Sequence, residues 1–118
     1  MKNPKTHKDL EVWKKSIDLV KTTYKLTKKF PEDEKYCLTQ QMRRAAISIP
    51  SNIAEGAGRS SFKEYVNFIN IASGSLSELE TQFIIAVELD YLEDIEELQQ
   101  IILSIKRMLR RLAESLKG

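Results

Sequence analysis

The sequence is poor in the residues that catalytic and metal sites most often use. It contains one histidine, His7, and one cysteine, Cys37, among 118 residues. Because His7 falls in an expected N-terminal tail, one chain cannot assemble a histidine-based triad, a zinc site or a di-iron site. A lone cysteine excludes an internal disulfide, and we interpret Cys37 as a packed small side chain. We therefore predict no catalytic residues, no metal, no cofactor and no enzymatic activity.

Long apolar runs and phosphate-binding loops are missing as well. No stretch approaches the roughly 20 apolar residues of a membrane-spanning helix, and the N-terminal residues MKNPKTHKDLE lack the apolar centre of a signal peptide. We therefore expect a cytoplasmic protein that does not contact membranes. The segment Gly56-Ala57-Gly58 has neither the glycine spacing of a phosphate-binding loop nor a strand before it.

Charges of both signs are present, but they are unevenly distributed. The formal net charge is only +2, yet residues 1–29 contain nine lysines, and residues 78–97 contain eight acidic residues and no basic one. A second basic cluster lies at residues 106–111. Two interpretations remain open. Either the charged faces complement one another in water, or the basic clusters form a surface that contacts the phosphates of a nucleic acid.

Apolar residues recur at helical spacing in four segments, and no segment alternates as a strand does. Two helices are expected at about residues 10–29 and 34–55, a third after Gly58, and a fourth at about residues 93–116. Their apolar stripes are Trp13, Ile17, Val20 and Tyr24; Leu38, Met42, Ala45, Ile49 and Ile53; Tyr65, Ile69, Ala72, Leu76, Leu79, Phe83 and Ala86; and Ile95, Leu98, Ile102, Ile105, Leu109, Leu112 and Leu116. We predict one all-α domain over residues 1–118, an antiparallel up-and-down four-helix bundle with residues 1–8 as a flexible tail.

Proline and serine mark the expected helix ends. Phe30-Pro31 ends the first helix, because the residue before a proline avoids the helical conformation. Pro50 removes one backbone donor, and since the apolar stripe continues beyond it, we expect a kink in the second helix rather than its end. Ser61 and Glu64 match a capping box at the start of the third helix.

Two further patterns concern packing. With a turn near residues 57–59, Ala45 and Ala46 are expected to lie opposite residues 71–74, where Gly74 would let the two backbones approach closely. Residues 83–87 and 101–103 are apolar on more than one helical face. This surplus predicts a homo-oligomer interface, and a broad core within one chain is the alternative.

One face of the second helix carries polar residues at steps of three or four. This polar stripe consists of Gln41, Arg44, Ser48, Asn52 and Glu55. Arg44 and Glu55 lie three turns apart, so each needs intermediates or partners on another helix. Glu78 and Thr81 of the third helix, or a neighbouring subunit, are the candidates. We interpret the stripe as a network that fixes helix register and assembly, because unpaired polar groups are costly when buried; a ligand-binding stripe is the alternative.

Four segments carry a resemblance to a known family. They are DLEVWKKSIDLV around Trp13, QMRRAA at residues 41–46, SIPSNIAEGAGR at 48–59 and IASGSLSELET at 71–81. Over nearly its whole length, the chain resembles the bacterial four-helix-bundle proteins encoded in intervening sequences of 23S ribosomal RNA genes. It is similar, more distantly, to the accessory variability determinant of diversity-generating retroelements, a pentameric barrel that binds nucleic acid and a reverse transcriptase. The resemblance implies a homopentamer and an association with RNA, and it supplies no catalytic residues.

Two functions of different classes fit these patterns. The first is a non-enzymatic oligomer that binds structured RNA through basic faces of the first and fourth helices, which can be neighbours in a bundle and so share one patch. Its candidate phosphate contacts are Lys14, Lys15, Lys21, Lys25, Lys28, Lys29, Arg107, Arg110 and Arg111. With few aromatic residues available for stacking, we do not expect sequence-specific recognition of single strands.

The second function is an oligomeric scaffold or adaptor that binds a protein partner. Its recognition surface would be the acidic residues 78–97, with the polar stripe serving assembly. An enzyme that uses the carboxylates of Glu55, Glu64 and Glu78 is the least favoured alternative, because carboxylates are common on helical bundles.

Overall fold

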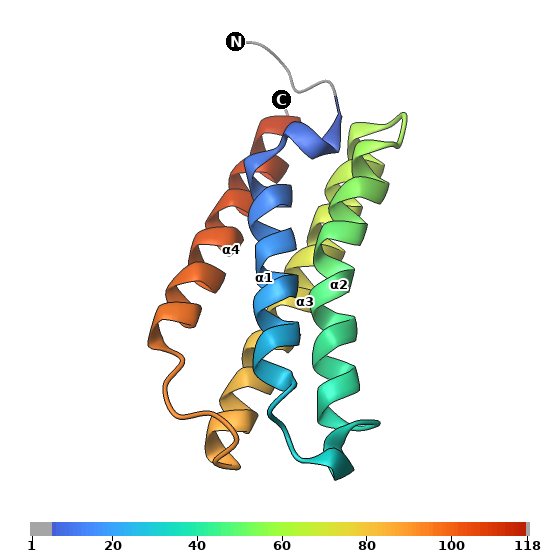
Figure 1. Cartoon of the computed structure of the whole chain (residues 1–118). Helices are drawn as coiled ribbons and strands as arrows, with labels where there is room; N and C mark the ends of the chain where they lie inside the picture. Colours follow the sequence, from blue (N-terminus) through green and yellow to red (C-terminus); the bar gives the residue numbers. More distant parts are fainter. Residues whose placement is uncertain (1–5, 118) are drawn as a thin grey trace.

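The structure, a computed structural model, describes residues 6–117. Over this range the chain forms α1 (Glu11–Thr27), α2 (Leu38–Ala57), α3 (Phe62–Glu88) and α4 (Glu96–Leu116), with short 3-10 helices η1 (His7–Asp9) and η2 (Glu32–Glu34). Each α-helix runs antiparallel to the one before it, so that α1 begins and α4 ends at the same end of the bundle (Figure 1). The predicted all-α four-helix bundle is confirmed. Of the expected tail, residues 1–5 lie outside the described residues.

Three helices place their predicted apolar stripes in one core. Its fully buried side chains include Met42, Ile49 and Ile53 of α2, Leu76, Leu79 and Phe83 of α3, and Ile102, Ile105 and Leu109 of α4. Residues at the ends of these stripes, such as Leu38 and Leu116, are half-buried. Each fully buried side chain of this size contributes roughly 1.5–3 kcal/mol of transfer free energy. Burial along the bundle axis is therefore the main stabilising contribution.

The core face of α1 differs from the prediction. The buried residues of α1 are Val12, Ser16, Leu19, Thr23 and Thr27, whereas the predicted stripe of Trp13, Ile17, Val20 and Tyr24 is half-buried. The three buried hydroxyls are satisfied because each donates to a backbone carbonyl of its own helix at 2.7–2.8 Å. The prediction was wrong because it counted these residues as polar. The predicted face instead lies toward α2, where Arg43 stacks on the ring of Tyr24.

Pro50 does not end its helix, as predicted, and the predicted cap of the third helix is present. Pro50 is buried inside α2, and the helix continues through it to Ala57. Ser61 caps α3, since its Oγ accepts the N–H of Glu64 at 3.1 Å. Among the described residues, no helix combines the length and the apolar character that crossing a membrane requires.

Helices α2 and α4 begin later than predicted. Cys37, just before α2, leaves the helical conformation (φ −120°, ψ −105°), and the side chain of Glu34 accepts the N–H of Leu38 at 3.3 Å. At α4, Asp94 Oδ1 accepts the N–H of Glu96 at 2.9 Å. Both acidic side chains therefore bond to backbone at a helix start instead of lying within the helix. Cys37 is exposed in this segment, so its interpretation as a packed side chain is wrong.

The register of α2 against α3 differs from the prediction by about one turn. Ser48 Oγ and Ser75 Oγ lie 2.8 Å apart. Because the two helices are antiparallel, this contact places Ala45 and Ala46 about one turn beyond residues 71–74. The expected pairing of the two alanines with that segment is therefore wrong.

The close approach of α2 and α3 occurs at a different glycine from the one predicted. Gly74 is exposed, and a Cβ atom placed there would meet no atom within 4 Å. At Gly56, which is buried, a Cβ atom would lie 2.9 Å from the Cβ atom of Phe68 and 3.2 Å from the carbonyl oxygen of Tyr65. Gly56, and not Gly74, allows the two backbones to come together.

The end of α3 is tied to the loop between α1 and α2. The N–H of Tyr91 bonds to the carbonyl of Ala86 at 2.9 Å, that of Asp90 bonds to Val87 at 3.0 Å, and Asp90 adopts the left-handed conformation at φ 64°. This pattern is a Schellman motif. It turns Tyr91 toward Glu34, whose Oε2 accepts the tyrosine hydroxyl at 2.7 Å. One carboxylate thus links η2, the start of α2 and the α3–α4 loop.

The Tyr91–Glu34 contact gives stability a dependence on alkaline pH. The hydrogen bond to Glu34, followed by burial, raises the pKa of Tyr91 above its ordinary value. The contact therefore stabilises the fold below the ordinary tyrosine pKa near 10 and is lost as the pH rises through the raised value. Tyr91→Phe should lower the melting temperature at pH 7, and the difference from the wild type should shrink at pH 11. A melting difference that is the same at both pH values would contradict this role.

Candidate nucleic-acid interface

The six lysines predicted for the first helix are all exposed, four of them in α1 and two, Lys28 and Lys29, directly after its end, and most of them follow the outermost line of the helix. Lys14, Lys21, Lys25 and Lys28 are separated by seven, four and three residues, which keeps them on one helical face. This face is opposite to the one that buries Leu19. The other two, Lys15 and Lys29, lie on one flank of this line. Four ammonium groups therefore project together into solvent.

None of these six lysines forms an ion pair with another described residue. Within residues 6–117, the ion pairs join Arg59 to Glu55, Arg59 to Glu64, and Lys106 to Glu80. The acidic residues of α1, Glu11 and Asp18, are exposed as well, and Asp18 lies on this face between Lys14 and Lys21, so the face carries four cations and one carboxylate. A phosphate can approach the lysines without breaking an intramolecular contact, and the counterions that it displaces favour association.

The predicted arginines of α4 are also exposed, but they do not form one cluster. Successive helical residues point about 100° apart. Arg110 lines a groove between α3 and α4, whereas Arg107 and Arg111 are exposed on other parts of the outer surface of the helix. The cations of α4 therefore extend from the groove beside α3 to the outer surface of the bundle.

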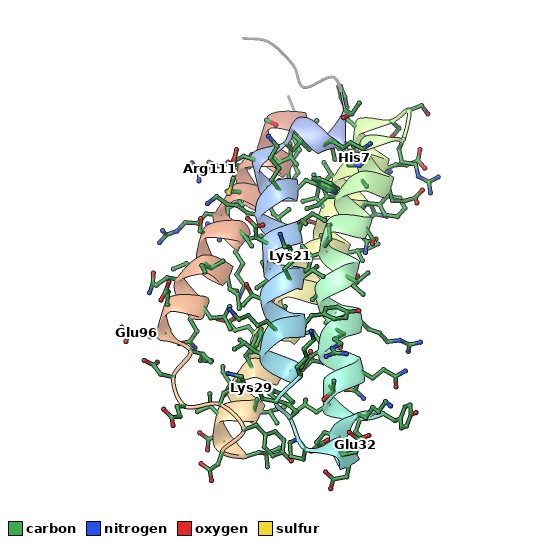
Figure 2. All side chains as sticks on the ribbon, viewed as in Figure 1. His7, Lys21, Lys29, Glu32, Glu96 and Arg111 are labelled. Carbon is green, nitrogen blue, oxygen red and sulfur yellow. The ribbon has the colours of Figure 1, made fainter. Side chains whose placement is uncertain are left out.

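Only parts of the two predicted basic clusters lie close together. Figure 2 shows Arg111 near the end of α4 where α1 begins, Lys21 near the middle of α1, and Lys29 at the opposite end of the bundle. Glu96 and Glu32 lie toward the same end as Lys29 (Figure 2). The first half of α1 and the second half of α4 can thus contribute to one basic surface. Lys28 and Lys29, just after α1, extend this surface toward an acidic end.

Ser48 and Asn52 of the polar stripe form a compact hydrogen-bonded group with Ser75 of α3. Asn52 Nδ2 donates to the carbonyl oxygen of Ser48 at 2.8 Å and to its Oγ at 2.9 Å. Ser48 Oγ in turn contacts Ser75 Oγ of α3 at 2.8 Å. The group bridges α2 and α3 and fixes their register. Ser75 was not among the predicted members, although it belongs to the IASGSLSELET segment.

The remaining members of the polar stripe do not join this group. Glu55 pairs with Arg59 at 3.0 Å, in a contact exposed to solvent. Glu78 accepts a hydrogen bond from Gln82 at 3.4 Å, and Thr81 donates to a carbonyl of its own helix. The candidate partners on α3 therefore make contacts within α3 instead of reaching the stripe.

Two stripe residues make no hydrogen bond or ion pair among the described residues. Gln41 and Arg44 are exposed on the side of α2 next to α3. Near this edge, Gln82 is 5% exposed, and its Oε1 has no hydrogen-bond partner among the described residues. On this part of the α2–α3 face, one buried acceptor, Gln82 Oε1, therefore lacks a partner among the described residues, next to exposed amide and guanidinium groups.

A sequence model of the family described as 23S rRNA-intervening sequence protein matches residues 8–111. The chain belongs to this family. The match includes the six lysines of α1, the polar stripe and the three arginines of α4, so the resemblance inferred from the four segments is confirmed. No curated protein matches the chain at a significant level.

One structural contact of this family member was not predicted. Arg43 lies in the RRAA part of the family segment, and its guanidinium stacks 4.4 Å from the ring centre of Tyr24. Its Nε donates to Thr27 Oγ1 at 2.9 Å, and Nη2 donates to the carbonyl of Tyr24 at 3.4 Å. A cation next to the carbonyl end of α1 interacts favourably with the dipole of that helix. Arg43 therefore has a structural role and is not free for a ligand.

The described residues of this family member offer little for metal chemistry. Within residues 6–117, no three histidine, cysteine, aspartate or glutamate side chains come together as a group that could hold a metal ion. The family description names no enzymatic activity. What the arrangement can do chemically is to present unpaired cations to an anionic partner.

Proposed function

We propose that this protein is a non-enzymatic, homo-oligomeric RNA-binding protein whose α1 lysines contact RNA phosphates. The observation that carries the proposal is the outward line of Lys14, Lys21, Lys25 and Lys28, which are exposed and form no ion pair with the described residues. Lysine binds phosphate as a point charge and needs no further geometry. The family description refers to 23S rRNA, which makes structured ribosomal RNA the first ligand to test.

The direct test is binding of a fluorescently labelled 23S rRNA fragment to the purified protein at low salt. Saturable binding is expected, with unrelated duplex DNA as the comparison. Since phosphate contacts carry no sequence information by themselves, the proposal allows DNA to bind as well. An absence of RNA binding at 50 mM salt, where electrostatic binding is strong, would contradict the proposal.

Homo-oligomer formation is supported by an apolar line on the outer face of α3. Ile71 and Ile85 of α3 and its C-cap residue Leu89 are 41–48% exposed, and helical spacing puts them on one side together with Gly74 and the exposed Glu78. The buried Oε1 of Gln82, which has no hydrogen-bond partner among the described residues, lies beside this line. A second copy that packs here would bury the isoleucines, and the missing side chain of Gly74 would permit close approach. The family resemblance implies a pentamer.

Changing this apolar line should dissociate the oligomer without unfolding the bundle. Ile85→Arg places a charge in the proposed interface, so light scattering should report a mass close to that of one 13.6 kDa chain. Ile47→Arg is the matched control, because Ile47 is equally exposed but belongs to α2, outside the apolar segments that predict the interface. Helical circular dichroism should be unchanged in both variants. A wild type that is monomeric at all concentrations would contradict the oligomer.

A scaffold that binds a protein partner is the second candidate function. One observation favours it, a groove of about 490 Å³ between α1 and α4. Leu26, Leu98 and Ile101 contribute apolar surface, and acidic side chains such as Glu93 and Glu97 line the same groove. An apolar groove with an acidic rim suits a basic amphipathic helix.

The scaffold function predicts dependence on the acidic groove and not on the α1 lysines. A basic protein that co-purifies with the wild type should be lost when Glu93, Asp94 and Glu97 are changed to glutamine. The same partner should be retained by Lys21→Gln. Equal retention by both variants would exclude the groove as its binding site.

A further inference from the structure

A groove lined by cationic side chains lies on the other side of α4 from α1. It has a volume of about 370 Å³ and runs between α3 and α4. One wall carries Ser73 and Ser77 of α3, and the other carries Lys106, Arg110 and Lys117 of α4. Steps of four and seven residues keep the three cations in line over about 16 Å of helix. Hydroxyl donors thus face a row of positive charges across a concave surface.

The net charge of this groove is positive. Lys106 is paired with Glu80, with Nζ and Oε1 2.8 Å apart. Arg110 and Lys117 are exposed and form no ion pair with a described residue. Glu114 is the acidic residue on the same wall. Two unpaired cations against one carboxylate, with serine hydroxyls opposite, are suited to phosphodiester oxygens.

The groove continues into a smaller hollow that carries an aromatic side chain. This hollow, of about 300 Å³, is lined by Phe62, Lys63 and Val66 of α3 and by Leu116 and Lys117 of α4. Lys117 borders both spaces, so the two hollows are neighbours along α3 and α4, and we call them together the α3–α4 track. Phe62 is 68% exposed, and of the described aromatic side chains only Tyr36 is comparably open to solvent. A phenyl ring at the start of α3 gains nothing from this exposure in one isolated chain.

We infer that this α3–α4 track binds single-stranded nucleic acid. The cations and hydroxyls of the groove hold the phosphodiester backbone, and Phe62 stacks against one base. A charged groove that follows the backbone, together with an aromatic platform for bases, is the general arrangement of single-strand sites. The inference rests on the proposed RNA-binding function, and it adds a surface and a form of ligand that the α1 lysines do not specify.

The two basic surfaces differ in the nucleic acid that they suit. The line of α1 is convex, has no aromatic residue on it and offers only point charges, which fits the backbone of a folded or duplex RNA. The α3–α4 track is concave and ends in a ring, and bases are available for stacking only where a strand is unpaired. A structured RNA with a single-stranded extension would contact both surfaces, because α4 separates them by the width of one helix.

The experiment measures fluorescence anisotropy with two probes. One is a 23S rRNA fragment, and the other is an oligouridylate of about ten nucleotides, a length within the range of known single-strand sites.

Arg110→Ala combined with Lys117→Ala should weaken oligouridylate binding and reduce its salt slope by about 1.4, since each single-strand phosphate contact contributes about 0.7. Phe62→Ala should weaken it about tenfold through lost stacking. Glu114→Gln should strengthen it, because a like charge is removed.

Matched controls lie outside the track. Tyr36→Ala removes the other exposed aromatic ring, and Lys35→Ala removes an exposed cation near α2. Neither should alter oligouridylate binding. Circular dichroism melting of each variant establishes that the bundle is intact.

The outcomes separate this inference from the proposed function. If the wild type binds both probes and the track variants lose only oligouridylate, the inference is supported. The track is not a single-strand site if oligouridylate binds equally well to the wild type and the track variants. The same conclusion follows if the wild type binds the rRNA fragment and not oligouridylate. In both cases RNA binding through the α1 lysines is unaffected. If neither probe binds at low salt, both proposals fail. A deoxyribose oligonucleotide of the same length shows whether the 2′-hydroxyl contributes.

Discussion

Gly56→Ala is expected to lower the free energy of unfolding by about 2 kcal/mol, the usual scale for an atom forced into a filled core. The new Cβ atom would lie 2.9 Å from the Cβ atom of Phe68, 3.0 Å from Cδ1 of Tyr65 and 3.2 Å from the carbonyl oxygen of Tyr65. The tyrosine ring can rotate, but a Cβ atom and a backbone carbonyl cannot move away alone. The first turns of α3 must therefore shift from α2, and the better helix propensity of alanine, worth up to ~1 kcal/mol, offsets only part of the loss.

Gly74→Ala is the matched control for this prediction. The chemical change is the same, the residue is again helical, and a Cβ atom would meet nothing within 4 Å. The variant should be more stable than the wild type by up to ~1 kcal/mol. Because a second copy is proposed to cover this face, urea unfolding should be followed at concentrations where light scattering reports monomers. If both variants are stabilised to the same extent, the packing of α2 against α3 at Gly56 is not as described.

Charge reversal on α1 should have the largest effect on RNA affinity. Lys21→Glu combined with Lys25→Glu removes two phosphate contacts and adds two repulsive charges. The affinity for a 23S rRNA fragment should fall at least about tenfold near 0.1 M salt, and the salt slope should decrease by about two. Both side chains are exposed on the outermost line of the helix, so the melting temperature should change little.

Lys35→Glu is the matched control for a single reversal on α1. Lys35 is exposed but lies between η2 and α2, outside the α1 line. Lys35→Glu changes the net charge by the same amount as Lys21→Glu. If the two single variants weaken RNA binding equally, the effect is one of net charge, and the α1 line is not the contact surface.

Sequence periodicity predicts the four-helix fold, but it does not predict which face of α1 is buried. The stripes of α2, α3 and α4 consist of aliphatic residues that can only be stabilised by burial, so their pattern determines the core face. In α1 the interior includes Ser16, Thr23 and Thr27. A hydroxyl that donates to its own helix behaves as a small apolar group. Periodicity scored by residue polarity therefore assigns the wrong face, although the helix itself is predicted.

The exposed candidate residues could be found from the sequence, but their grouping could not. The lysines of α1 lie on one helix, so their spacing alone predicts a common face. Arg107, Arg110 and Arg111 are close in sequence, yet they point in different directions because each step rotates by about 100°. The glycine contacts depend on the register of α2 against α3, which is fixed by Ser48 and Ser75. The α3–α4 track combines residues more than thirty positions apart, which no local pattern connects.

The measurement that tests RNA binding by the α1 lysines most directly is the affinity of the wild-type protein for a 23S rRNA fragment over a salt series. If four outward lysines each displace a counterion, the plot of log affinity against log salt concentration should be linear, with a slope of about −3 to −4 per chain in contact. The slope should become shallower in the Lys21→Glu, Lys25→Glu variant. An affinity that does not change with salt, or that is already absent at 50 mM salt, would contradict an electrostatic RNA-binding surface on this bundle.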